Sequence, residues 1–305
     1  MAGARDIQRR IKSVKNTKKI TKAMEMVSSS KMRRAVGNVL ATRPYSDFAW
    51  EMIVDIASKT NVELHPLLFK RESINKIGVI VITSNRGLCG SFNQQVINKG
   101  LDYIKSQEDS NVEIEVIALG KKAARGMVRF KQNVVAEFEK DDVLSEIIEI
   151  RPLAKMILND YLEEKYDKVV VVYTDFISAL KQISRVKQLL PIEPHEDEAL
   201  GKVGKAGKIE KSDVVSYRHK TEYIFEPNPK VILDDLLPRL LEVQIYQASL
   251  ESNASEHSAR MMAMKNASEA ANDMIDELTL TYNQARQAAI TAEIAEISGG
   301  KAALE

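Results

Sequence analysis

The longest regular pattern in the chain is a seven-residue repeat of apolar positions near its C-terminus. Steps of four and three residues connect Leu236, Leu240, Val243, Gln247, Leu250, Ala254, His257, Met261, Met264, Ser268, Ala271, Ile275, Leu278, Tyr282, Ala285, Ala289, Ala292 and Glu296. The segment Arg239–Ser298 contains neither proline nor glycine. A repeat of this period predicts a long helix with a left-handed coiled-coil seam. Gly299 and Gly300 predict where that helix ends.

A second, less regular stripe lies near the N-terminus. Its positions are Ile7, Ile11, Val14, Thr17, Ile20, Met24 and Val27. The other faces are basic, because Met1–Arg34 contains 11 Lys and Arg residues and only two acids. The segment Glu251–Glu305 has nine acids and four bases. Two helices of opposite charge from opposite ends of the chain are expected to pair antiparallel.

The middle of the chain alternates between two periodicities. Apolar runs typical of buried strands cover residues 76–84, 111–119 and 168–178, an added edge strand covers 181–192, and segments with helical spacing cover 93–107 and 144–166. This alternation predicts a sheet of buried, parallel strands flanked by helices. The charged, glycine-spaced stretch at 196–213 predicts a surface loop.

These patterns together predict an α/β fold: a Rossmann-like central domain with two long terminal helices that form an antiparallel coiled coil. The expected division is an N-terminal helix at 1–60, an α/β domain at 61–228 and a C-terminal helix at 229–305. A helix of 60 residues is about 90 Å long, whereas an α/β domain of this size is about 40 Å across. The terminal helices are therefore expected to need a partner that encloses them.

Composition narrows the function classes only slightly. The 305 residues include 44 Lys and Arg against 43 Asp and Glu, so net charge does not select a partner. No apolar stretch reaches the roughly 20 residues that span a bilayer, and we expect no insertion into the membrane. Cys89 is the only cysteine, which excludes an internal disulfide and a cysteine-based zinc site.

The sequence SNRGLCGSFN (84–93) directly follows an apolar strand and resembles a phosphate-binding or nucleophile-bearing turn. Its glycines follow the pattern G-x-x-G, which is not a dinucleotide fingerprint. Cys89 has no His and Asp pair nearby in the sequence that would activate it. We therefore predict a strand-to-helix turn in which Gly87 and Gly90 adopt backbone angles that other residues avoid.

A second glycine-rich stretch, GKVGKAGKIEKS (201–212), resembles a P-loop. The spacing from Gly201 to Gly207-Lys208 is one residue too long, and Ile209 stands where Ser or Thr must contact magnesium. No His or acidic residues cluster at metal-ligand spacing. We expect no catalytic residue, no cofactor site and no metal site.

The basic N-terminal helix leaves one alternative open. Such a stripe of Lys and Arg also suits a nucleic-acid phosphate backbone. Met and Ser in AMEMVSSSKM stand where a nucleic-acid groove would present Arg and aromatic residues, so a helix face that contacts a protein partner is the favoured interpretation. A coiled-coil adaptor or nucleic-acid-binding protein with a Rossmann-like domain stays as the alternative hypothesis.

Three stretches resemble the gamma subunit of a bacterial F-type ATP synthase. They are NTKKITKAMEMVSSSKMRRA (16–35), SNRGLCGSFN (84–93) and SEHSARMMAMKNASEAANDMIDELTLTYNQARQAAITAEIAEISGG (255–300). The resemblance implies a non-catalytic rotor subunit of the central stalk of a proton-translocating enzyme. That subunit couples rotation of the membrane ring to conformational changes at the catalytic beta subunits.

The same resemblance implies partners and a location. The expected partners are the alpha and beta subunits, which bind ATP and magnesium themselves, the epsilon subunit and the ring of c subunits, without nucleic acid. The terminal helices are the expected shaft, and the α/β domain is the expected foot. The expected location is the cytoplasmic side of the cell membrane, as a peripheral protein.

Four positions match family contacts with the beta subunit. Met24 in KAMEMV aligns with the shaft position near the beta lever. Arg286, Gln287 and Thr291 in RQAAIT align with the catch contacts on beta. These four residues are the expected partner-contact site.

Overall fold

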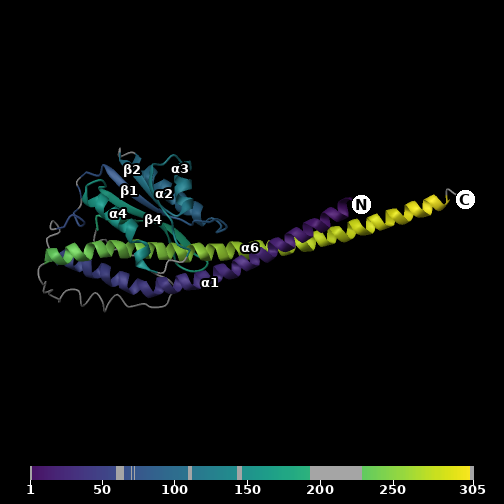
Figure 1. The fold of residues 1–305 in the computed structure, drawn as a ribbon, viewed down its shortest axis with the longest axis horizontal. Helices are drawn as coiled ribbons and strands as arrows, with labels where there is room; N and C mark the ends of the chain where they lie inside the picture. The colour runs from purple at the N-terminus through teal and green to yellow at the C-terminus, as the bar shows by residue number, and fades with distance from the viewer. Residues whose placement is uncertain are drawn as a thin grey trace. The chain divides into compact units, whose positions relative to one another are not determined.

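The computed structural model describes residues 2–59, 65–69, 71, 73–108, 112–142, 146–192 and 229–302. Its elements are α1 (Ala2–Lys59), β1 (Lys76–Ile82), α2 (Phe92–Glu108), β2 (Glu113–Leu119), α3 (Lys121–Arg129), β3 (Val134–Phe138), the 3₁₀-helix η2 (Ile147–Glu149), α4 (Arg151–Leu162), β4 (Lys168–Phe176), β5 (Gln182–Leu190) and α6 (Pro229–Ala302) (Figure 1). The predicted loop at 196–213 and the glycine-rich stretch at 201–212 lie outside the described residues. The domain divisions after residues 60 and 228 border undescribed segments and stay predictions.

The chain forms two compact units. Unit 1 comprises residues 1–29 and 260–305, and unit 2 comprises residues 30–259. Both long helices contribute to each unit, because α1 and α6 continue from one into the other.

Unit 2 is built around a five-stranded sheet in the order β3-β2-β1-β4-β5. The first four strands in this order are parallel, and β5 pairs antiparallel with β4 at the edge. This confirms the predicted α/β fold and the added edge strand. The sequence analysis missed β3 and α3, because five and nine residues are too few for a periodic pattern to stand out.

Each face of the sheet carries its own apolar core. One core joins α2 and α3 to side chains of β1, β2 and β4. The other joins α4, α6 and part of α1 to the opposite face. The helix α6 therefore belongs to the domain core, as the green part of its ribbon shows in Figure 1.

The stretch of α6 in unit 2 is covered on all sides. From Leu240 to Ser258 every side chain is buried except Glu242, which is half-buried. A seven-residue seam describes only one side of a helix, so the predicted repeat does not account for this stretch. Packing against both the sheet and α1 accounts for it.

The ends of α6 differ from the expectation in one respect. The helix continues to Ala302, so the predicted end at Gly299 and Gly300 is wrong. A glycine costs a helix only about 1 kcal/mol relative to alanine, which does not by itself end a helix. Pro238 also lies inside α6, where the buried neighbours Leu237 and Leu240 hold its turn in the core.

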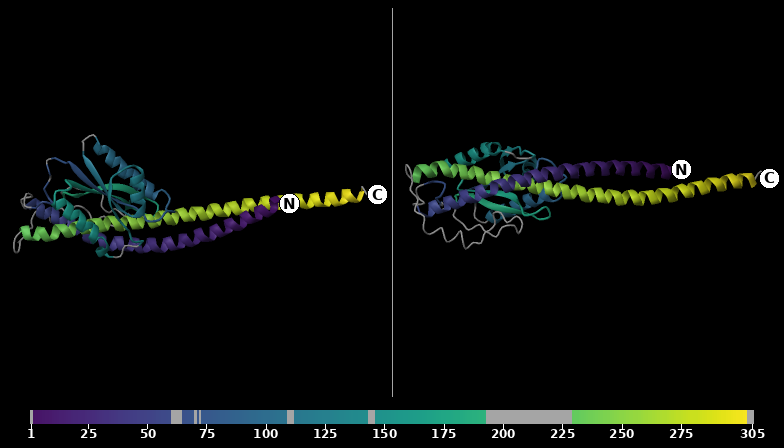
Figure 2. Two further views of the ribbon diagram at one scale, coloured as in Figure 1. Left: turned by 45° about the horizontal axis from the view of Figure 1, so that its top comes forward. Right: turned by 90° about the horizontal axis from the view of Figure 1, so that it is seen from below.

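Unit 1 is an antiparallel pair formed by the first half of α1 and the last part of α6, with both chain ends on the same side in the two views of Figure 2. Between residues 264 and 298 the side chains of α6 that are not exposed are Met264, Ala267, Ser268, Ala271, Ile275, Leu278, Tyr282, Ala285 and Ala289. All of them except Ala267 belong to the predicted seam. The coiled-coil seam is thus confirmed in this half of the helix as far as Ala289. Ala292 and Glu296, also predicted, are exposed.

The seam of α1 is only partly the predicted one. Its covered or half-covered positions in unit 1 are Ala4, Ile7, Ile11, Val14, Lys18, Thr21, Met24, Glu25, Ser28 and Ser29. Thr17, Ile20 and Val27 were assigned to the seam but are exposed. The prediction followed apolar side chains through three successive steps of three residues. The observed seam instead keeps alternating steps of three and four, even where that places Lys18 and Thr21 in it.

Candidate functional site: contact surfaces of the terminal helices

The glycine turn after β1 is a tight structural connection. Gly90 has a φ of 57°, in the left-handed region, as predicted. Gly87 has no positive φ, and the prediction for it was wrong. The exposed Leu88 takes the left-handed conformation instead, with a φ of 63°.

Cys89 is enclosed within this turn. The side chain is 1% exposed, and the amide nitrogen of Asn93 lies 3.2 Å from its sulfur. The amide oxygen of Asn93 also accepts a hydrogen bond of 3.0 Å from the backbone N–H of Ser84. A thiol that is buried and held this way packs the turn and is not accessible as a nucleophile.

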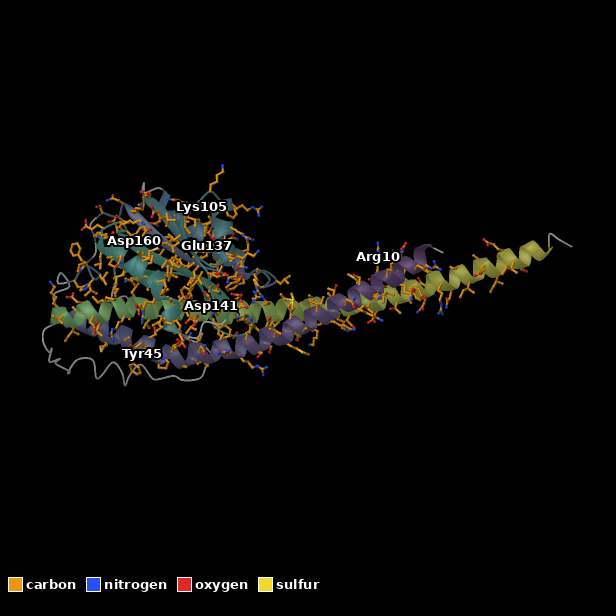
Figure 3. All side chains as sticks on the ribbon, viewed as in Figure 1. Arg10, Tyr45, Lys105, Glu137, Asp141 and Asp160 are labelled. Atoms are coloured by element: carbon orange, nitrogen blue, oxygen red, sulfur yellow. The ribbon has the colours of Figure 1, made fainter. Side chains whose placement is uncertain are left out.

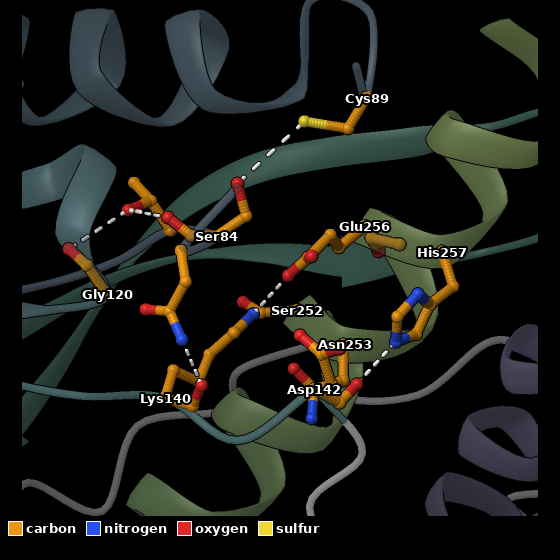
Figure 4. Close-up of polar contacts among 12 residues, drawn as sticks. Ser84, Cys89, Gly120, Lys140, Asp142, Ser252, Asn253, Glu256 and His257 are labelled. Carbon is orange, nitrogen blue, oxygen red and sulfur yellow. Dashed lines mark hydrogen bonds and ion pairs between the residues drawn. The ribbon is translucent and has the colours of Figure 1, made fainter. Parts of the chain in front are cut away.

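The carboxyl edge of the parallel strands, where α/β folds commonly bind ligands, is occupied by the chain itself. Lys140 follows β3 and donates to Glu256 of α6 at 2.6 Å, and both side chains are at most 3% exposed. Asn85 links the end of β1 to the carbonyl of Lys140 and accepts from the N–H of Lys121 at the start of α3. Figure 4 shows α6 presenting Glu256 to this edge.

Gly120 allows the strands and α3 to close over this edge. Its φ is 103°, and a Cβ at this position would lie 2.5 Å from the carbonyl oxygen of Thr83. A cavity of about 330 Å³ remains beside Asn85, Lys121 and Lys140. Lys121 and Lys140 pair with acids there. In the described part of the chain no group of three or more His, Cys, Asp or Glu side chains could hold a metal ion.

A second buried polar contact joins α1 to α6. Arg43 and Gln247 each donate to the same oxygen of Glu251 at 3.0 Å, and Thr42 donates to Gln247 at 2.9 Å. The second carboxylate oxygen of Glu251 has no hydrogen-bond partner among the described residues. Burial raises the pKa of Glu251 to about 7, although both donors act in the opposite direction.

A third contact ties α1 and α6 to the segment after β3. Lys31 donates to Asp142 at 2.7 Å, and the ring of His257 contacts the carbonyl oxygen of Asp142. The hydrogen bond from Lys31 lowers the pKa of the Asp142 carboxyl, against the effect of burial. Unit 2 therefore holds both long helices through buried polar pairs as well as through its apolar core.

The structure brings three of the four predicted contact residues together. Arg286, Gln287 and Thr291 are exposed on neighbouring faces of α6 in unit 1. Met24 is half-buried on α1. Because Lys18 contacts Asn272 across the antiparallel pair, Met24 lies near residue 266, about 30 Å along the helix from Arg286.

The sequence analysis missed an apolar stripe beside these residues. Ile290, Ile294 and Ile297 are 48%, 62% and 69% exposed, and their spacing of four and three places them on one side of α6. From Ile290 to Ser298 every described side chain is exposed. The signal was present in the sequence as large apolar residues outside the seven-residue repeat. On α1, Ile20 and Val27 are also more than half exposed, although the prediction placed them in the seam.

None of the described helices is both long and apolar enough to cross a membrane.

Comparison with known proteins identifies the family. A family model described as ATP synthase matches residues 3–304. The chain is 42% identical to the ATP synthase gamma chain of Herpetosiphon aurantiacus, over 100% of this chain and 99% of that protein. It is 40% identical to the ATP synthase gamma chain of Nitrosospira multiformis, over the full length of both.

Solved structures have the same fold. The chain is similar to a chain of the Euglena gracilis mitochondrial ATP synthase (OSCP, F1 and c-ring, rotational state 3), with a TM-score of 0.64 and 20% identity over 99% of this chain and 95% of that one. A chain of the rotor of the same enzyme gives a TM-score of 0.62 at 21% identity, over 95% of this chain and 99% of that one. Full-length identity, the family model and the fold agree, and the chain belongs to the ATP synthase family as a gamma chain, a non-catalytic subunit.

Proposed function

We propose that unit 1 is the part of a rotating central stalk that turns inside a collar of alpha and beta subunits in a proton-translocating F-type ATP synthase. In this function the chain transmits torque and catalyses no reaction. It couples rotation of a membrane ring to the conformations of three catalytic beta subunits.

The observation that carries the proposal is the exposed apolar stripe Ile290, Ile294 and Ile297. Exposed isoleucines at this spacing are a typical feature of a helix face that packs against another protein. Within unit 1 the seam already buries the side chains that α1 can cover, so the stripe requires a surface from outside the chain. Membership of the gamma-chain family supports a collar of alpha and beta subunits as that surface.

Coupling requires that the shaft contact each beta subunit differently at each orientation. A conformational equilibrium shifts only by as much as its states differ in affinity for the shaft. Unit 1 has different sides: the isoleucine stripe on α6, and the basic faces of α1. Rotation therefore presents each beta subunit with apolar and cationic surfaces in turn.

The four sequence-matched residues have distinct roles in this proposal. Arg286, Gln287 and Thr291 flank the isoleucine stripe and supply polar contacts to the catch region of beta. Met24 lies about 30 Å away and contacts the beta lever. The shaft would then contact each beta subunit at two levels along its length, so rotation would act on the lever and on the catch region.

Unit 2 completes the proposed assembly as the foot. We infer that it binds the epsilon subunit and the c-subunit ring, which places the chain on the cytoplasmic side of the cell membrane as a peripheral protein. The support is its membership of a family whose solved relatives include rotor and c-ring assemblies.

Hydrogen exchange on residues 271–292 tests the collar. In the isolated chain this stretch should exchange quickly, because the seam is narrow and Ala271, Ala285 and Ala289 bury little area per turn. In the assembled complex it should exchange at least tenfold more slowly. Equal and slow exchange in both would show that unit 1 needs no collar, and would contradict the proposal.

A pair of methionine variants tests the role of Met24. Met24→Lys places a cation beside the half-buried seam and should reduce proton pumping per ATP hydrolysed more than it reduces assembly. Met26→Lys is the matched control, because Met26 is 62% exposed on another side of α1. Unchanged pumping in assembled Met24→Lys enzyme would remove Met24 from the contact site.

The comparisons give no support to the alternative of a nucleic-acid-binding adaptor. A direct check is salt-dependent binding to random DNA, which the adaptor requires. Co-purification with large nucleotide-binding subunits is expected of the stalk subunit.

A further inference from the structure

A groove in unit 2 lies between α2 and the edge strand β5. Its volume is about 590 Å³. Lys99, Asp102, Tyr103 and Ser106 line one wall, and their spacing of three, one and three residues places them on a single face of α2. Residues 183–187 of β5 line the other wall.

The strand wall of this groove has unused backbone groups. Among the described strands β5 pairs only with β4, so half of its N–H and C=O groups point away from the sheet. Among the described residues no hydrogen bond beyond the ladder with β4 reaches the backbone of Ile183, Ser184, Arg185 or Val186. An open edge of this kind is a template for one more strand.

Two side chains in the groove carry buried hydroxyls without partners. They are Tyr103 of α2 and Ser184 of β5, whose oxygens have no hydrogen bond to any residue that the structure describes. Burial raises the pKa of Tyr103, so its hydroxyl keeps its proton and remains a donor. A buried hydroxyl is normally paired, and both residues line the groove.

The charge of the groove favours an acidic ligand. Arg185 pairs with Asp175 at 2.8 Å, and Lys187 contacts Gln244, so both are engaged within the domain. Lys99 is exposed and makes no ion pair within the described residues. Asp102 is the only acid among the lining residues.

We propose that this groove docks an extended, acidic segment of a partner polypeptide, which pairs with β5 as a sixth strand. A free anion would engage Lys99 but would leave the row of backbone groups unpaired. An added strand supplies carbonyl oxygens and N–H groups at the repeat of β5, and main-chain pairing provides the affinity while side chains set the specificity. Its acidic side chains would face Lys99.

Hydrogen exchange of residues 182–190 in the purified native complex and in the isolated chain tests the added strand. Amides of β5 should exchange at least tenfold more slowly in the complex. Lys99→Glu should return them toward the rates of the isolated chain. Lys105→Glu is the matched control, because Lys105 is also exposed on α2, does not line the groove and points into solvent in Figure 3. It should leave the protection intact.

Cross-linking identifies the occupant. A Ser184→Cys variant labelled with a benzophenone should cross-link, in the native complex, to an acid-containing segment of another subunit. A cross-link to residues 193–228 of the same chain or to a second copy would overturn the proposal. Equal exchange of β5 in the complex and the isolated chain would overturn it as well, as would protection that Lys99→Glu does not change.

Discussion

The two halves of α6 meet different environments although they belong to one continuous helix. In unit 2, from Leu240 to Ser258, polar and apolar side chains are covered alike. In unit 1, from Lys265 to Ser298, only a narrow seam is covered, and large apolar side chains such as Ile294 stay exposed.

The difference shows where the chain itself supplies the neighbours of the helix. In unit 2 the sheet, α4 and α1 enclose α6, so each buried polar group requires a partner from the same chain. In unit 1 α1 is the only described element that covers the helix, and the uncovered isoleucines leave room for a partner. One half of the helix is part of a domain core, and the other is the docking surface that we propose.

The largest effect is expected at the buried ion pair of unit 2. Glu256→Gln leaves the Lys140 charge buried without a counter-charge and should lower the free energy of unfolding of the isolated chain by about 4 kcal/mol. Urea denaturation measures it. The double variant Lys140→Met with Glu256→Leu should regain most of that loss, whereas Glu269→Gln, at an exposed position of α6, should change stability by less than about 0.5 kcal/mol.

Two alanine substitutions in α6, one in each unit, compare the two halves of this helix directly. Leu250→Ala removes a side chain that is 0% exposed in unit 2 and should cost about 3 kcal/mol of stability. Ile294→Ala removes a similar volume in unit 1 and should cost the isolated chain less than about 0.5 kcal/mol. Ile294→Ala should instead weaken association with the alpha and beta subunits. Equal losses of stability would mean that the two halves are not distinct.

The pH dependence of stability provides a smaller test of the buried half. Because the pKa of Glu251 is raised to about 7 in the folded chain, the folded state holds a proton that the unfolded state releases near pH 4.5. The contribution of this group is therefore full below about pH 4.5 and is lost as pH rises toward 7. Glu251→Gln should lack this loss.

The measurement is the difference in unfolding free energy between Glu251→Gln and the native chain at several pH values. It should shift by about 2 kcal/mol in favour of the variant between pH 4.5 and 7. Burial lowers the pKa of His65, which acts in the opposite direction, but both proteins share that effect and it cancels in the difference. A constant difference would contradict the raised pKa.

The smallest effect is expected at the polar contact within unit 1. The half-buried Lys18 donates to the exposed Asn272 at 2.6 Å. Lys18→Ala should therefore change the stability of the isolated chain by about 0.5 kcal/mol or less. A loss of several kcal/mol would mean that this pair is as essential to unit 1 as Lys140 and Glu256 are to unit 2.

Local pattern was sufficient for much of the fold. The strands β1, β2 and β4 are long apolar runs. The seam of α6 from Met264 to Ala289 follows the seven-residue repeat that is typical of a helix paired with another helix. The exposure of Arg286, Gln287 and Thr291 follows from the same period, because they lie outside the seam. Their contact with beta subunits stays a proposal.

Other features depended on partners far away in the sequence. The pairs Lys140–Glu256 and Arg43–Glu251 join residues separated by 116 and 208 positions, so no local window contains both members. The polar seam positions of α1, such as Lys18 and Thr21, were missed because apolar character was followed instead of spacing.

The sequence by itself determined the periodicities, and with them the elements: long helices at both ends and a parallel sheet between them. Only the tertiary structure decided which stretch of α6 is enclosed, because enclosure depends on how many elements surround a helix and not on its own pattern. A glutamate is costly to bury alone and tolerable beside a lysine or arginine, and only folding brings that partner within hydrogen-bonding distance.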